Sequence, residues 1–402
     1  MADLFAGIDA GKSHHHCVVI DADGNRLLSQ KITNDETVIT NLIDEVNTLT
    51  DPSGSVTWAT DLNRGGAALL IALMNAHGQT LLYIPGRTVY NAAATYRGEG
   101  KTDAKDAGII ADQARMRRDL QPIRLGDDIA TELRLLTAHR TDLTCDRTRA
   151  INRMRASLGE FFPGLEAAFD YSTSKAALLL LTGYQTPAEI RRMGAKRLTA
   201  WLKKRGAKSA ARVADIAVDA AHKQHTTVPG QDAGAMIVAR LAAEILRLRD
   251  DITGIENRIE NRFREHADAK ILLSMPGFGP LLGAEFTAAT GGGIAQFDSA
   301  NRLAGIAGLA PAPRDSGRIS GNHHRPKRYD RRLLRACYLA AQAASRWCPV
   351  SKSFYDRKRA KGKSHKQAIL ALARRRINVL WAMLRDRTMF SQGIAPIPEC
   401  IT

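Results

Sequence analysis

Aromatic residues are scarce in this sequence, at 5% of its 402 residues. A core with few large rings favours helices packed through Ala, Leu and Ile. The five cysteines are scattered and form no C-x-x-C pair, which argues against a zinc site or a disulfide framework and favours a reducing compartment. No apolar run approaches the roughly eighteen residues of a membrane span, and no basic stretch followed by a long apolar one opens the chain. We therefore expect a cytoplasmic protein without a membrane partner.

Positive charge, in contrast, is abundant and unevenly placed. The chain carries a formal net charge of +17 and a pI near 9.9. Residues 311–402 hold 21 Lys and Arg against 5 Asp and Glu. Clustered cations gain affinity by releasing counterions from phosphates, so we expect a polyanionic partner. A basic surface that is merely solvated is the simpler alternative.

The apolar pattern divides the chain into three regions. In residues 1–125, three strand-like segments are followed by alternating helices and strands, which predicts an α/β domain with a mixed sheet. Residues 126–268 have a helical pattern throughout, and residues 269–402 form a basic, mainly helical region. The predicted fold class is therefore α/β plus all-α, because 402 residues exceed what one core normally serves.

Two segments of the central region carry apolar residues at coiled-coil spacing. One runs from Ile129 to Leu158, and in the other, from Leu241 to Ile259, the apolar residues alternate steps of four and three. An intramolecular antiparallel hairpin and a dimerising coiled coil both fit this spacing. The residues between, 166–227, are predicted to form an inserted helical subdomain, and no chemistry is evident in them.

Four aspartates suit a metal-dependent nuclease. Asp9 lies at the end of an apolar strand, Asp61 lies at the end of the strand formed by residues 56–60, and Asp103 and Asp106 are spaced to share one face of a helix. Together their oxygens suit Mg²⁺, and two metal ions could clamp the attacking and leaving oxygens of a phosphodiester. Taken singly, Asp9 also fits an ATPase strand or a plain turn, and the pair Asp103 and Asp106 fits an ordinary helix N-terminus.

Lysines and histidines adjoin these acids. We expect three lysines in the acid-bearing motifs to contact nucleic acid: Lys12, Lys101 and Lys105. The run from His14 to His16 could suggest metal binding, but consecutive residues on a strand point to alternate faces. Exposed side chains at the start of a strand are the expectation for these histidines.

A glycine-containing turn lies between two apolar helices near residue 277. Gly277 and Gly279 are expected to let backbone N–H groups face a phosphate at a helix N-terminus, as in a helix-hairpin-helix DNA contact. A tight interhelical turn without DNA is the alternative.

A serine in the basic segment is a candidate nucleophile. Ser316 lies between Arg314 and Arg318, so it could attack a phosphodiester while the guanidinium groups stabilise the developing charge. A flexible basic loop is the alternative, and Ser320 competes for the nucleophilic role. Three further cations are expected to bind nucleic acid: Arg325, Lys327 and Arg328.

In this order the motifs resemble the DEDD-type transposases of the IS110 family, which are related to the pilin-gene invertases. The resemblance covers nearly the whole chain. It rests on segments 7–9, 101–107, 275–280 and 303–317. The family usually has Glu at the second acid, where this chain has Asp61, and the helical insertion makes this a longer member.

The resemblance implies an RNase H-like (RuvC-like) N-terminal domain whose tetrad is Asp9, Asp61, Asp103 and Asp106, binding Mg²⁺. It also implies that Ser316 attacks DNA and becomes covalently linked to it, in a site shared between subunits of a homodimer or homotetramer. Members use a structured non-coding guide RNA that pairs with donor and target DNA. An RNA guide would account for how little base-reading equipment the sequence shows.

The leading hypothesis is therefore an RNA-guided transposase or site-specific recombinase acting at the bacterial nucleoid. A hydrolytic RuvC-like junction nuclease, using the four acids and water without a covalent intermediate, is the second. A nucleic-acid-binding protein without enzymatic activity is the third.

Overall fold

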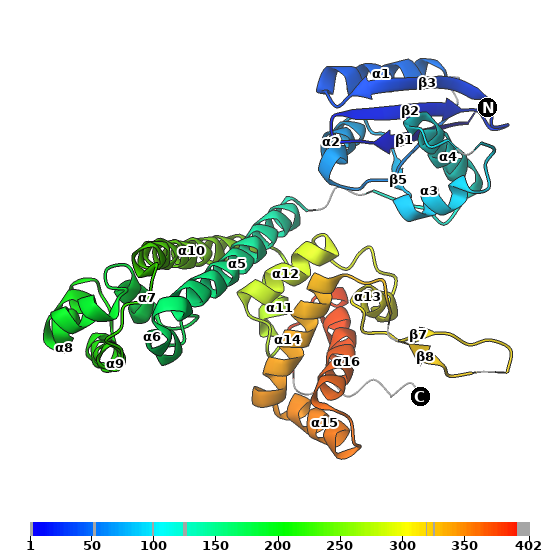
Figure 1. Cartoon of the computed structure of the whole chain (residues 1–402). Coiled ribbons are helices and arrows are strands. Elements are labelled where there is room, and N and C mark those ends of the chain that lie inside the picture. The colour runs from blue at the N-terminus through cyan, green and yellow to red at the C-terminus, as the bar shows by residue number, and fades with distance from the viewer. Residues whose placement is uncertain are drawn as a thin grey trace. The chain divides into compact units, whose positions relative to one another are not determined.

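The computed structural model describes residues 3–50, 54–98, 100–123, 127–318, 320–324 and 326–391. Arg325, one of the expected nucleic-acid contacts, lies outside this range. The chain separates into two compact units, Met1–Leu125 and Gly126–Thr402, which are described one at a time (Figure 1). None of the described helices is long and apolar enough to cross a membrane.

The N-terminal unit is built on a six-stranded sheet in the order β3-β2-β1-β4-β5-β6. Its strands are β1 Leu4–Ala10, β2 His14–Ile20, β3 Arg26–Thr33, β4 Val56–Thr60, β5 Leu81–Tyr83 and β6 Gln121–Pro122. β1, β2 and β3 pair antiparallel, β1, β4 and β5 pair parallel, and β6 is antiparallel to β5. The predicted mixed sheet is confirmed, and it is consistent with an RNase H-like domain.

Helices cover both faces of this sheet. They are α1 Glu36–Thr48, the short η1 Gly65–Ala67, α2 Ala68–Ala76, α3 Gly86–Ala93 and α4 Asp103–Met116. Because side chains alternate along a strand, Ala6 and Ile8 of β1 pack with α1 and α2, whereas Phe5 packs with α3 and α4. Each face therefore has its own apolar core, and β1 lies between them.

Two long helices form an arm of the second unit. α5 Asp128–Phe161 and α10 Gln231–Arg264 pack against each other in opposite directions, since Leu133 near the start of α5 shares a core with Ile259 near the end of α10. The coiled-coil spacing thus serves an intramolecular hairpin. Short helices lie between α5 and α10 in the chain: α6 Pro163–Ala168, α7 Lys175–Leu181, α8 Pro187–Lys204 and α9 Ala210–His222. They share one core with the end of α5 and the start of α10, which form one half of the arm (Figure 1).

The remaining helices form a second core with the start of α5 and the end of α10, which make up the other half of the arm. They are α11 Ala269–Ser274, α12 Pro280–Thr290, α13 Ala300–Ile306, α14 Arg331–Trp347, α15 Pro349–Ala360 and α16 His365–Arg385. A small hairpin, β7 Ala312–Pro313 and β8 His323–His324, projects between α13 and α14 (Figure 1).

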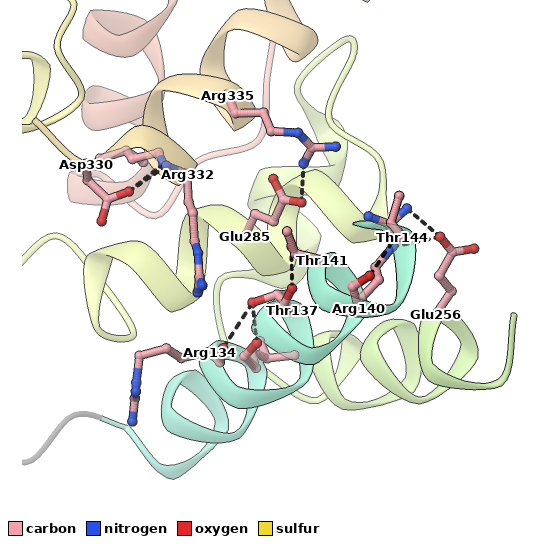
Figure 2. A network of polar contacts seen from close by, with 12 residues as sticks. Arg134, Thr137, Arg140, Thr141, Thr144, Glu256, Glu285, Asp330, Arg332 and Arg335 are labelled. Atoms are coloured by element: carbon pink, nitrogen blue, oxygen red, sulfur yellow. Dashed lines mark hydrogen bonds and ion pairs between the residues drawn. The ribbon is translucent and has the colours of Figure 1, made fainter. Parts of the chain in front are cut away.

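Ion pairs tie these elements together, as Figure 2 shows. Arg140 of α5 donates from Nε to Glu256 Oε1 of α10 at 2.7 Å. Arg335 of α14 pairs with Glu285 of α12, whose side chain is only 7% exposed. Asp330 caps α14 by accepting from the backbone N–H groups of Arg332 and Leu333, each at 2.8 Å. The two ion pairs therefore link α5 to α10 and α12 to α14, and the Asp330 cap fixes where α14 begins.

Candidate active site

The close approach of α4 to β1 positions the candidate acids. Gly7 lies in β1, and a Cβ atom there would lie 2.2 Å from the Ala107 carbonyl oxygen and 2.3 Å from the Ala111 nitrogen. Only glycine admits the helix backbone this closely. Asp9 follows Gly7 by two residues and therefore projects from the same face of the strand. The first turn of α4, which precedes Ala107, contributes Asp103 and Asp106.

Asp61 reaches the same edge of the sheet from the neighbouring strand. β1 and β4 are parallel and pair Ile8 with Thr60, so Asp9 and Asp61 follow directly at their carboxyl ends. The backbone N–H of Ala10 donates to Asp61 Oδ1 at 3.4 Å. This contact holds the Asp61 carboxylate against the end of β1.

A side-chain cap fixes where α4 begins. Thr102 has extended backbone angles and its hydroxyl accepts from the Lys105 N–H at 3.2 Å. Asp103 and Asp106 therefore lie in the first turn, where the positive end of the helix dipole stabilises negative charge. The two acids thus lie at an ordinary capped helix N-terminus, which was one of the two interpretations of their spacing. The same position is compatible with metal binding by both acids.

Electrostatics show that the four carboxylates interact. Burial, followed by the charges of Asp61, Asp103 and Asp106, raises the pKa of Asp9 from 3.8 to about 6, while Lys101 opposes the shift. Burial also raises the pKa of Asp61, and Asp106 adds to that effect. Like charges this close disfavour ionisation unless a cation lies among them. The charges of Asp61, Asp103 and Asp106 therefore add to the effect of burial at Asp9.

The donor set suits a hard divalent cation, because it consists of carboxylate oxygens. Across the described ranges, however, no three His, Cys, Asp or Glu side chains are already arranged to hold a metal ion.

The glycine turn near residue 277 joins α11 to α12. A Cβ atom at Gly277, whose φ is +86°, would lie 2.2 Å from the Ala340 carbonyl oxygen, so this glycine packs tightly against α14. Gly279 is the N-cap of α12 and has no heavy atom near its Cβ position. Arg376, which is 7% exposed, donates to the Pro276 carbonyl and to Ser351 Oγ. A buried guanidinium thus holds the turn in place, and burial lowers its pKa to about 10.

Ser316 lies exposed on the loop of the β7–β8 hairpin. Arg314 donates from its backbone to Asn322 O at 2.8 Å, and Asn322 donates from its backbone to Asp315 Oδ1 at 2.9 Å. These bonds close the loop around Ser316 and Gly317, whose φ is +50°. The neighbouring cations are exposed as well: Arg314, Arg318, Lys327 and Arg328.

Known proteins match both regions. Residues 6–163 match the DEDD domain of IS110 transposases, and residues 269–356 match the transposase domain of the IS116/IS110/IS902 family. An uncharacterized 42 kDa protein of insertion element IS900 from Mycobacterium paratuberculosis is 62% identical over 387 residues, covering 96% of this chain and 97% of that protein. A 44.8 kDa protein of IS116 from Streptomyces clavuligerus is 49% identical over 388 residues, or 96% of each. The chain belongs to the IS110 family of transposases.

A transposase cuts and joins DNA, so the resemblance inferred from the motifs and the expectation of an enzyme are both confirmed. The expected kinship with invertases is also found, because a pilin gene-inverting protein of Moraxella bovis is 32% identical over 130 residues, or 31% of this chain and 39% of that protein. The first matched region of the transposase contains the four aspartates, and the second contains Gly277, Gly279 and Ser316. Helices α7, α8, α9 and α10 lie between the two regions.

The lysines near the acids differ in their surroundings in this transposase. Lys12 and Lys101 are exposed, and Lys101 acts on the Asp9 carboxylate through its charge. Lys105 is half-buried and donates from Nζ to the Gly98 carbonyl, which ties α4 to the preceding loop. Lys12 lies in a turn that Asn34 holds by donating from Nδ2 to the Lys12 carbonyl at 3.1 Å.

The histidine run departs from expectation. His15 is 1% exposed, so the prediction that these side chains are exposed is wrong at this position, because β2 turns that face toward α1 and α2. His14 is exposed. His16 pairs with Asp9 across the strands, and Asp103 acts on it electrostatically. Sequence reasoning missed His16 because the neighbour of Asp9 depends on the β1–β2 register.

Proposed function

We propose that this IS110-family transposase cuts and rejoins DNA through a covalent phosphoserine intermediate. The observation that supports the proposal is geometric: the parallel pairing of β1 with β4 and the packing of α4 against Gly7 bring the four acid-bearing segments to one edge of the sheet. In this account Asp9, Asp61, Asp103 and Asp106 hold Mg²⁺. The bound metal supplies positive charge that orients the scissile phosphate and stabilises its transition state.

The serine performs the exchange of phosphodiester bonds. The Ser316 hydroxyl loses its proton as Oγ bonds to phosphorus, and the bond from phosphorus to one deoxyribose oxygen breaks. The released sugar hydroxyl takes up a proton. Rejoining reverses these events with a hydroxyl from another strand, so no external energy source is needed. Arg314 and Arg318 steady the phosphate near the serine.

The assembly forms part of the same proposal. Acids of one subunit act with Ser316 of another in a dimer or tetramer, and a structured guide RNA pairs with donor and target DNA. The exposed cations of residues 311–391 and the scarcity of aromatic residues support contact with phosphate backbones rather than reading of bases. We assign the three regions 1–125, 126–268 and 269–402 to metal binding, spacing and DNA handling.

Trapping the intermediate tests the serine. The transposase is incubated with guide RNA, donor DNA and target DNA, and the products are run on a denaturing gel. Covalent protein–DNA product is expected for the native chain and for Ser320→Ala, and none for Ser316→Ala with DNA binding retained. Cleavage without any covalent product would instead favour the hydrolytic nuclease.

Substitution of the acids tests the metal cluster. Asp103→Asn and Asp106→Asn should each abolish cleavage. Asp61→Glu should retain it, because Glu also offers a carboxylate and the family resemblance implies that Glu is usual at this position. Unchanged recombination in both Asn variants would show that the cluster has no catalytic role and would favour a non-enzymatic protein.

A further inference from the structure

Tyr90 is an exposed aromatic residue on α3, the helix whose first residue adjoins Asp61. Its side chain is 78% exposed, although tyrosine rings usually pack against apolar neighbours. It belongs to α3, which is anchored through the buried Val89 and lies beside α4, the helix that carries Asp103 and Asp106 (Figure 1). The ring is therefore held on a fixed helix while its faces stay open to solvent.

Helix geometry directs Tyr90 toward Asp61. Gly86 is the first residue of α3, and a Cβ atom there would lie 3.5 Å from Asp61 Oδ2. Tyr90 follows Gly86 by four residues, so both occupy one face of the helix. Side chains in a helix lean toward its N-terminus, which places the ring over the turn that contains Gly86. Because Gly86 has no side chain, this residue places no atom beyond its backbone between the ring and the Asp61 carboxylate.

We propose that Tyr90 binds the nucleobase adjacent to the scissile phosphate by stacking on it. This inference rests on the proposed role of the carboxylates, because a phosphate held there places a neighbouring base within reach of α3. Stacking tolerates any base, since every base offers a π-face. The charge of the helix agrees with a polyanionic occupant, because α3 contains no acidic residue and Arg87 is exposed beside Tyr90.

Photo-crosslinking tests the contact directly in the full-length transposase. A DNA strand carrying 5-iododeoxyuridine near the cleavage point is bound with guide RNA and irradiated, and tryptic peptides are identified by mass spectrometry. We expect a cross-link in the peptide from Thr88 to Arg97, at Tyr90. The same peptide contains Tyr96, whose hydroxyl donates to Asp112 Oδ2 at 2.6 Å, as an internal control. Cross-links elsewhere in the chain but none at Tyr90, at every position of the modified base, would overturn the proposal.

Kinetics separate stacking from a structural role. Tyr90→Ala should raise the KM for DNA by about fivefold or more, the smallest loss expected for one base–aromatic stack, and leave kcat nearly unchanged. Tyr90→Phe keeps the ring and should restore the native KM. Leu69→Ala, on α2 at the opposite face of the sheet, is the matched control. Equal KM values for Tyr90→Ala and the native chain would refute the base contact. So would a change in the subunit count of Tyr90→Ala, measured by light scattering, because it would show that the residue has a structural role.

The two proposals fail in different ways. If Asp106→Asn abolishes cleavage while Tyr90 gives no cross-link, only the base contact is wrong. If Tyr90 cross-links to DNA while both Asn variants remain active, the metal cluster is wrong and the DNA contact stands.

Discussion

Replacing Asp9 by Asn tests the electrostatics of the acid cluster. Burial and three neighbouring carboxylates raise the pKa of Asp9 from 3.8 to about 6. One pKa unit corresponds to about 1.36 kcal/mol, so ionised Asp9 destabilises the metal-free fold by at most about 3 kcal/mol. Solvent screening of this partly exposed group reduces that value to about 1 to 2 kcal/mol. Since Asn is uncharged, Asp9→Asn should be more stable than the native chain by that amount at neutral pH without metal.

The pH dependence of this difference has a definite sign. The Asp9 carboxyl ionises near pH 3.8 in the unfolded chain and only near pH 6 in the folded chain. The free energy of unfolding of the native chain therefore falls, by the contribution of this one group, as the pH rises through this window. The advantage of Asp9→Asn should be absent below about pH 4, grow up to about pH 6 and then stay constant.

Hydrogen–deuterium exchange of β1 and α4 measures this local stability. In EDTA the variant should exchange more slowly than the native chain, and in Mg²⁺ the order should reverse, because a bound cation stabilises only the native cluster. Asp44→Asn, an exposed change of the same charge on α1, is the control. Faster exchange of Asp9→Asn in EDTA at neutral pH, or an equal response of both proteins to Mg²⁺, would refute the reasoning.

Three further predictions concern the contacts that support the acid cluster, the glycine turn at Gly277 and the serine loop. Gly7→Ala should lower the free energy of unfolding by about 1 to 3 kcal/mol and abolish activity, because the new methyl group would clash with α4. Urea unfolding compares this variant with Gly100→Ala, where nothing lies within 4 Å of the new methyl group. Equal unfolding midpoints for the two variants would contradict the prediction. Arg376→Met should lower stability by about 1 to 3 kcal/mol, since the Pro276 carbonyl loses its donor, and an unchanged melting temperature would argue against the anchor. Asp315→Ala should reduce covalent product formation at Ser316, because Ala cannot accept from the Asn322 N–H. Asp315→Asn should retain it, because the Asn side chain still offers an acceptor. Equal yields for the two variants would show that this loop contact has no role in the reaction.

The local pattern of apolar residues was sufficient to predict many of the helices and strands of this protein. Alternating apolar residues predicted β1 to β3, and the acids could be placed at strand ends and in a helix turn because those positions depend on nearby residues. Short elements were missed: α3 has one buried residue, Val89, and β6 has two residues, too few for a periodic signal. The coiled-coil spacing indicated two paired helices, but an intramolecular and an intermolecular partner present the same stripe.

The sequence by itself determined which face each side chain takes, because helix and strand periods follow from backbone geometry. Only the tertiary structure decided which elements become neighbours. The parallel pairing of β1 with β4 joins Asp9 to Asp61, the space at Gly7 admits α4, and the β1–β2 register sets His16 opposite Asp9. The first two contacts join segments far apart in the chain, and the third depends on the register of a hairpin. Their energies come from packing and hydrogen bonds that no local pattern contains.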